Sequence, residues 1–146
     1  MDRNIIKVSF DALPENQGFA RSVVSGYLAM SDPTVEELAE VKTAVSEAVS
    51  NSIIHGYKDM DAGRIDMEMK MVGADRCVIR ITDYGRGIED VEKAREPMFS
   101  TESDREMSGM GFTVMESFAD KVQVRSEPGK GTEVVLIKNL DLYDVR

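Results

Sequence analysis

The sequence is poor in the residues that build disulfides and zinc sites. Its 146 residues include one cysteine, Cys77, and one histidine, His55. A single cysteine excludes an internal disulfide and suits a reducing compartment. A zinc site usually takes three or four nitrogen or sulfur ligands, so the chain lacks the ligands for one. Cys77 lies in an apolar strand pattern, where a buried and unreactive thiol is expected.

Long apolar runs and excess positive charge are also missing. No stretch approaches the roughly 18–20 apolar residues of a membrane span, and the first residues show no apolar run of signal-peptide length. The chain has 18 lysine and arginine residues against 27 aspartate and glutamate residues, so its formal net charge is −9. This balance argues against direct binding to nucleic acid or to an anionic membrane. We therefore expect a cytoplasmic protein with neither kind of partner.

The hydrophobic patterns predict one domain that spans residues 1–146, with three main helices and five strands. The length fits a single domain. Apolar residues at helical spacing predict helices at about 14–30, 33–55 and 112–119, with one further turn near 91–95. Alternating residues predict strands at 5–10, 65–71, 77–81, 122–125 and 133–138. Because the late strands follow each other as a hairpin, we expect an α+β two-layer sandwich, with helices on one face of a mixed, mostly antiparallel sheet.

The second predicted helix carries a polar stripe. Glu47, Asn51 and His55 follow one another at four-residue intervals and so share one helix face. Asparagine is mildly unfavourable inside a helix, and the small neighbour Ser52 would let another group approach closely. The same spacing is also typical of an ordinary solvated helix face.

Three glycine-containing turns are the other candidate motifs. The first, Asp83-Tyr84-Gly85-Arg86-Gly87, directly follows a strand, where glycine permits a sharp turn or a close backbone approach. The second, Ser108-Gly109-Met110-Gly111, precedes a helix whose free N–H groups favour a phosphate. The third, Gly129-Lys130-Gly131-Thr132, leads into the last strand. Each is also compatible with a plain turn, and none is a Walker or Rossmann motif.

Taken in this order, the stripe and the three turns resemble the Bergerat-type ATP-binding fold of the gyrase B, histidine kinase and MutL ATPases. Two longer strings, at residues 45–57 and 108–118, resemble the anti-sigma-F factors of endospore-forming bacteria. The resemblance covers essentially the whole chain. It implies an ATP-dependent serine protein kinase that inhibits a sporulation sigma factor and phosphorylates the anti-anti-sigma antagonist of that inhibition on serine. It also implies ATP and Mg²⁺ as cofactors and a homodimer that pairs through the N-terminal strand and the sheet.

The resemblance assigns roles to individual residues. Asn51 is implied to hold the Mg²⁺ of the nucleotide, and Glu47 to be the general base that accepts the proton of the incoming serine hydroxyl. Asp83 is implied to accept a hydrogen bond from the adenine amino group, with Thr132 behind that contact. Arg21 on the first helix is implied to contact the protein partners, although an ordinary solvated arginine is the other interpretation. The remaining residues implied to bind the nucleotide are Gly85, Gly87, Arg105, Ser108, Gly109, Met110 and Gly111.

The segment at residues 97–108 is implied to be a lid over the triphosphate, and it departs from the family at two positions. Glu102 stands where the family commonly has lysine, and Met107 where it commonly has arginine. Those cations would meet the γ-phosphate, and Arg105 is the nearby replacement. The departure gives some weight to an alternative, a module that sequesters a sigma factor and uses ATP structurally, with little or no phosphotransfer. A sensor histidine kinase fragment is disfavoured because the sole histidine, His55, lies on the nucleotide helix.

Overall fold

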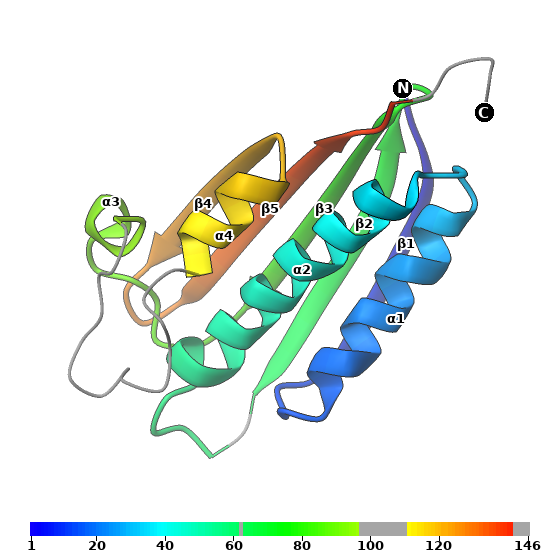
Figure 1. Cartoon of the computed structure of the whole chain (residues 1–146). Coiled ribbons are helices and arrows are strands. Elements are labelled where there is room, and N and C mark those ends of the chain that lie inside the picture. The colour runs from blue at the N-terminus through cyan, green and yellow to red at the C-terminus, as the bar shows by residue number, and fades with distance from the viewer. Residues whose placement is uncertain (62, 97–110, 142–146) are drawn as a thin grey trace.

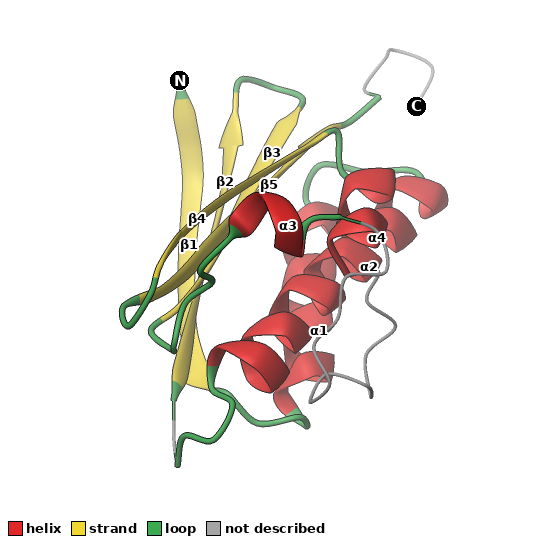
Figure 2. Cartoon of the chain, turned by 90° about the vertical axis from the view of Figure 1, so that its left-hand side faces the viewer, coloured by secondary structure: helices red, strands yellow, loops and turns green. Residues whose placement is uncertain are grey.

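The protein consists of a five-stranded sheet with helices packed on one of its faces (Figures 1 and 2). A computed structural model describes residues 1–61, 63–96 and 111–141. Figure 2 shows α1, α2 and α4 together on one side of the sheet. In chain order the elements are β1 (Asp2–Asp11), α1 (Asn16–Ala29), α2 (Val35–Asn51), a π-helical turn (Ser52–Gly56), β2 (Arg64–Val72), β3 (Arg76–Asp83), α3 (Val91–Ala94), α4 (Gly111–Phe118), β4 (Lys121–Glu127) and β5 (Gly131–Asn139).

The sheet has the strand order β1-β2-β3-β5-β4. All four described pairs of neighbouring strands are antiparallel, so the sheet that the sequence predicts as mixed or mostly antiparallel contains no parallel pair among the described residues. The α+β two-layer prediction is confirmed. The first strand lies at the edge of the sheet, and it begins three residues earlier than the predicted strand at residues 5–10.

The core lies between the sheet and the two long helices. On β2, Ile65, Met67, Met69 and Met71 all face the helices and are at most 1% exposed. The apolar stripe of α2 meets them through buried valines. Cys77 is completely buried in this core, and burial raises the pKa of its thiol to about 12. The prediction of an inert thiol is therefore confirmed, because the reactive form is the thiolate.

The second helix is shorter than the predicted range of 33–55. Its first turn is set by a capping box, in which Thr34 accepts from the N–H of Glu37 and the Glu37 carboxylate accepts from the N–H of Thr34. Regular α-helix ends at Asn51 and is followed by the π turn, which the N–H of Tyr57 closes by donating to the carbonyl of Ser52 at 3.1 Å. Such wide turns occur frequently at functional sites.

The outer face of the sheet is polar and faces away from the helices (Figure 2). Glu68 on β2 pairs with Lys7 at 3.5 Å and with Arg80 at 3.2 Å, and Lys70 pairs with Asp2 at 2.9 Å. This alternation of apolar and charged residues is what an antiparallel strand with one wet face requires. In the described part of the chain, no helix combines the length and the apolar character needed to cross a bilayer.

Candidate functional site

The carboxylate of Asp83 is buried at the end of β3, on the face that carries the helices. Asp83 as a whole is 3% exposed. The hydroxyl of Ser52 donates to Asp83 Oδ2 at 2.7 Å, and the N–H of Gly85 donates to Oδ1 at 3.0 Å. Burial raises the pKa of the Asp83 carboxyl, while the hydrogen bonds from Ser52, Gly85 and the Thr132 backbone oppose that rise. A buried acceptor of this kind suits a ligand that brings an N–H donor.

Thr132 lies beside Asp83 at this end of the sheet. The two residues are directly opposite each other in the pairing of β3 with β5, and Ser126 is opposite Thr132 in the pairing of β5 with β4. Residues opposite each other on neighbouring strands point to the same face of a sheet. The Ser126 and Thr132 hydroxyls are 2.8 Å apart, so a row of polar side chains crosses this end of the sheet.

Glycines clamp the loop after Asp83 between its neighbours. A Cβ on Gly85 would lie 1.9 Å from the carbonyl oxygen of Gly56, and one on Gly131 would lie 2.1 Å from the carbonyl oxygen of Asp83. Gly87 has a φ of +78°, and a Cβ there would lie 2.3 Å from the carbonyl oxygen of Glu127. These contacts are between backbones, so the glycines let three segments approach one another and fix where Asp83 points.

Two further hydrogen bonds hold this loop in place. The N–H of Arg86 donates to the carbonyl of Gly56 at 2.8 Å, and the N–H of Gly129 donates to the carbonyl of Arg86 at 2.7 Å. Backbone groups of the loop therefore bond on one side to the π turn and on the other to the turn between β4 and β5. These bonds hold in place the loop that directly follows the carboxylate of Asp83.

Asn51 and Glu47 lie half-buried, one turn apart on α2. Gly111, the first residue of α4, packs against Asn51, because a Cβ on Gly111 would lie 3.1 Å from Asn51 Oδ1. The carboxylate of Glu47 makes no hydrogen bond or ion pair with the described residues, and burial raises its pKa. His55 falls in the π turn, where the α-helical spacing that placed it in the polar stripe no longer applies.

Arg21 is half-buried between α1 and α2. Its guanidinium donates to the hydroxyl of Ser46 at 2.9 Å, and Gln17 donates to the same oxygen at 2.9 Å. Ser46 directly precedes Glu47 on α2. The guanidinium of Arg21 therefore ties α1 to the helix that carries Glu47, and its implied contact with protein partners stays a prediction.

The rest of the predicted site lies outside the described residues. Arg105, Ser108, Gly109 and Met110 belong to this group, as do the lid positions Glu102 and Met107. The described chain thus brings together the Asp83 part and the Asn51 part of the predicted site.

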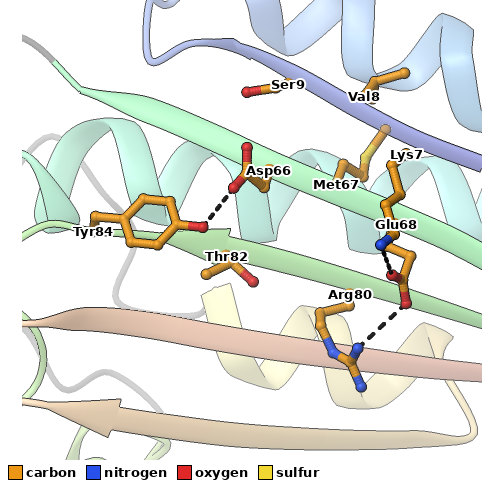
Figure 3. A pocket seen from close by; sticks show the side chains of 9 residues that line it. All are labelled: Lys7, Val8, Ser9, Asp66, Met67, Glu68, Arg80, Thr82 and Tyr84. Carbon is orange, nitrogen blue, oxygen red and sulfur yellow. Dashed lines mark hydrogen bonds and ion pairs between the residues drawn. The ribbon is translucent and has the colours of Figure 1, made fainter.

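A hollow of about 410 Å³ lies on the opposite, outer face of the sheet (Figure 3). It is lined by Lys7, Val8, Ser9, Asp66, Met67, Glu68, Arg80, Thr82 and Tyr84. None of these is a predicted site residue. Figure 3 shows that polar side chains in the hollow bond to each other, Tyr84 to Asp66 and Glu68 to both Lys7 and Arg80.

Two residues that support the site were not predicted as part of it. Ser52 was noted only as small, yet its hydroxyl bonds to Asp83. Tyr57 is buried, and its hydroxyl accepts from the N–H of Tyr84 at 2.7 Å and donates to the carbonyl of Arg64 at 2.5 Å. No sequence pattern identifies these bonds, because they join residues that only the fold brings together.

The carboxylate of Asp83 and the amide oxygen of Asn51 fit a purine nucleotide that carries Mg²⁺. A carboxylate acceptor suits an exocyclic amino group, and a neutral amide oxygen is an acceptable Mg²⁺ ligand when phosphates and waters complete the octahedron. Among the described residues, no cluster of three or more carboxylate, histidine or cysteine side chains is positioned to hold a metal ion on its own.

Comparisons with known proteins agree with this chemistry. The family model described as a histidine kinase-like ATPase domain matches residues 10–138. The anti-sigma F factor of Clostridium beijerinckii is 46% identical over 142 residues, which cover 97% of this chain and 99% of that protein. The anti-sigma F factor of Anoxybacillus flavithermus is 47% identical over 138 residues and 94% of each chain.

Solved structures show the same fold at much lower identity. One contains the RsbU and RsbW domains of a Mycobacterium tuberculosis protein, with a TM-score of 0.69 and 18% identity over 94% of this chain and 33% of that one. Another is the mycobacterial sensor histidine kinase MprB, with a TM-score of 0.57 and 15% identity over 92% of this chain and 98% of that one. At such identities the likeness concerns the fold alone.

Proposed function

The chain belongs to the anti-sigma F factor family of histidine kinase-like ATPases, and from that premise we propose that it binds ATP, inhibits a sigma factor and phosphorylates a serine of the protein that antagonises this inhibition. The observation that carries the proposal is the buried Asp83 carboxylate, which is held at a strand end beside the helix of Asn51 and Glu47. Under this proposal the protein acts in the cytoplasm during sporulation, and Mg²⁺ is the ion that accompanies the ATP it binds.

Asp83 would select adenine. Its ionised carboxylate only accepts hydrogen bonds, and adenine presents an amino donor where guanine presents a carbonyl acceptor. Thr132 lies next to that contact on the same face of the sheet. Gly85 and Gly87 support the loop that forms the adjoining wall.

Asn51 would hold Mg²⁺ through its amide oxygen. The ion would neutralise charge on the phosphates, and phosphoryl transfer depends mainly on such positioning and charge stabilisation. The N–H groups at the start of α4, beginning with Gly111, would face the same phosphates. Arg105, Ser108, Gly109 and Met110 remain proposals from the family resemblance.

Glu47 would act as the general base. The serine oxygen attacks the γ-phosphorus, its proton moves to the Glu47 carboxylate, the bond to the bridging oxygen breaks, and ADP leaves. The pKa of Glu47 is raised by burial, which makes its carboxylate a better proton acceptor. Among the described residues, none forms a hydrogen bond or ion pair with the Glu47 carboxylate.

The partner surface would include Arg21, which lies on the helix that packs against the helix of Glu47. The strand β1 at the edge of the sheet is available for pairing in a homodimer.

The test combines labelled ATP, a candidate antagonist protein and two variants of one helix. Glu47→Gln should keep the ATP dissociation constant within a few-fold and lower phosphate transfer by roughly 10²–10⁴-fold, the usual contribution of a general base. Glu36→Gln, an exposed acid in the first turn of α2, should change neither quantity.

Two outcomes would redirect the proposal. If the wild-type protein binds the sigma factor and ATP but transfers no label, it is a sequestering module that uses ATP structurally, as the lid residues Glu102 and Met107 would suggest. If calorimetry detects no ATP binding at all, the function proposed for this site is wrong.

A further inference from the structure

Ser52 and Asp83 form a buried polar pair on facing elements. Ser52 is 5% exposed and Asp83 is 3% exposed, and their oxygens are 2.7 Å apart although the residues are 31 positions apart in the chain. A hydrogen bond this short to a carboxylate is of the strong, charge-assisted kind. Asp83 continues the inward-facing row of Cys77, Ile79 and Ile81 on β3, so a charged group stands at a position that the core would fill with an apolar side chain.

The carboxylate of Asp83 has few restraints of its own. The terminal torsion of aspartate has a broad, two-fold energy profile, so the carboxylate plane turns easily unless both oxygens are held. Here Ser52 holds Oδ2 and the N–H of Gly85 holds Oδ1. The two carboxylate oxygens have four lone pairs, and the donors from Ser52, Gly85 and the Thr132 backbone use three of them, so one remains for a further donor. These hydrogen bonds therefore fix the direction in which the remaining lone pair points.

The space around the carboxylate supports the same conclusion. A Cβ on Gly56 would lie 2.9 Å from Asp83 Oδ2, so the lack of a side chain at Gly56 is what lets this oxygen pack closely against the π turn. Ser52 and Gly56 are the first and last residues of that turn. The turn thus supplies a hydrogen-bond donor at one end and, at the other, the space into which the carboxylate fits.

From this geometry we infer that Ser52 is a positioning residue for purine recognition: its hydroxyl orients the Asp83 carboxylate toward the 6-amino group of the base. The inference rests on the proposed function, since it specifies how the adenine-reading residue is aimed. Ser52 itself does not need to touch the nucleotide.

A pair of ligands tests this role directly. ATP carries the 6-amino group, whereas purine riboside triphosphate has hydrogen at that position and is otherwise the same. Binding of both is measured by calorimetry, in the presence of Mg²⁺, to the wild-type protein and to Ser52→Ala. The matched control is Thr43→Ala, which removes an exposed hydroxyl on α2, the helix that precedes the π turn; this hydroxyl donates to the carbonyl of Ala39.

We expect Ser52→Ala to weaken ATP binding about tenfold, close to the low end of the effect of one hydrogen bond to a charged group. Binding of the 6-hydrogen ligand should change less than twofold, and Thr43→Ala should change neither. In an Asp83→Asn background, the ATP-specific effect of Ser52→Ala should disappear, because Ser52 acts through that carboxylate. Circular dichroism and a melting curve establish that each variant is folded.

The outcomes separate this inference from the proposed function. If the wild-type protein prefers ATP over the 6-hydrogen ligand and Ser52→Ala keeps that preference, or weakens both ligands equally, Ser52 has only a structural role and the inference is overturned. If the wild-type protein binds the two ligands equally, Asp83 does not read the amino group, and the proposed role of Asp83 falls together with the inference.

Discussion

Where β2 pairs with β3, each face of the sheet carries an aspartate, and the pKa values of these two aspartates are shifted in opposite directions. Asp83 lies on the inner face, where burial raises the pKa of its carboxyl. Asp66 lies on the outer face, where hydrogen bonds from Tyr84 and then Ser9 lower the pKa of its carboxyl. In the strand register Asp83 is opposite Ile65, the residue just before Asp66, so the two acids are close in the sheet.

The difference shows what a carboxylate needs in order to serve a ligand. Asp66 has its partner within the protein, the Tyr84 hydroxyl seen in Figure 3. Asp83 is kept from water and is only partly compensated by its own hydrogen bonds, so a donor from a ligand would complete its environment. Tyr84 links the two sites, because its N–H bonds to Tyr57 while its side chain crosses to the outer face.

Gly85→Ala should break the inner site most strongly. The added Cβ would lie 1.9 Å from the carbonyl oxygen of Gly56, a backbone atom that cannot swing aside. We expect a loss of about 3 kcal/mol in the free energy of unfolding, the upper range for overpacking. Urea denaturation measures this loss.

Gly26→Ala is the matched control for that variant. Gly26 lies in α1 with nothing within 4 Å of an added Cβ, so alanine there should stabilise the protein by roughly 0.5–1 kcal/mol. Equal stabilities of the two variants would show that the loop after Asp83 is not tightly clamped.

Asp83→Asn and Asp66→Asn should separate the two faces by nucleotide affinity. Loss of the charged acceptor at Asp83 should weaken ATP binding by about 2 kcal/mol, roughly 30-fold. The same change at Asp66 should leave ATP affinity within twofold, because Asp66 faces away from the helices. Calorimetry with Mg-ATP measures both, and an equal loss in the two variants would contradict the assignment of the site to the inner face.

The pH dependence of stability should differ in sign between the same two variants. The folded pKa of Asp83 is raised, so its contribution to stability is present below the unfolded pKa, near 3.8, and is lost as pH rises through the folded pKa. The folded pKa of Asp66 is lowered, so its contribution is present above 3.8 and is lost as pH falls through the folded pKa.

Denaturation of each variant beside the wild-type protein at several pH values measures this contrast. As pH falls toward 3.8, Asp83→Asn should lose stability relative to the wild type. Below 3.8, Asp66→Asn should gain stability relative to the wild type. Parallel curves for the two variants would mean that the two faces do not differ electrostatically.

Tyr84→Phe should have the smallest effect. It removes the hydroxyl that bonds to Asp66 on the exposed side and leaves the Tyr84 N–H bonded to Tyr57. We expect a loss of about 0.5 kcal/mol in stability, at the low end for a hydrogen bond, and a pKa of Asp66 that moves up toward its ordinary value. Nuclear magnetic resonance titration measures that pKa, and ATP affinity should stay unchanged.

The fold was predictable to the extent that patterns of period two and 3.6 report burial. The alternation of Ile65, Met67 and Met69 with charged residues identified β2 and its inner face. The end of α2 was not predictable, because the apolar stripe continues through Ile53 while the backbone changes to a π turn after Asn51. For the site, the order of Glu47, Asn51, Asp83 and Thr132 pointed to a nucleotide, and the fold places Thr132 beside Asp83.

The sequence by itself determined the secondary-structure pattern, the two-layer class and the family, because these depend on local periodicity and on motifs in a fixed order. Only the tertiary structure decided that Ser52 meets Asp83, that Tyr84 turns to Asp66, and that two aspartates in one sheet have pKa values shifted in opposite directions. The physical reason is that a carboxylate responds to its distance from water and from donors. Those distances are set by the packing of segments that are remote in the chain.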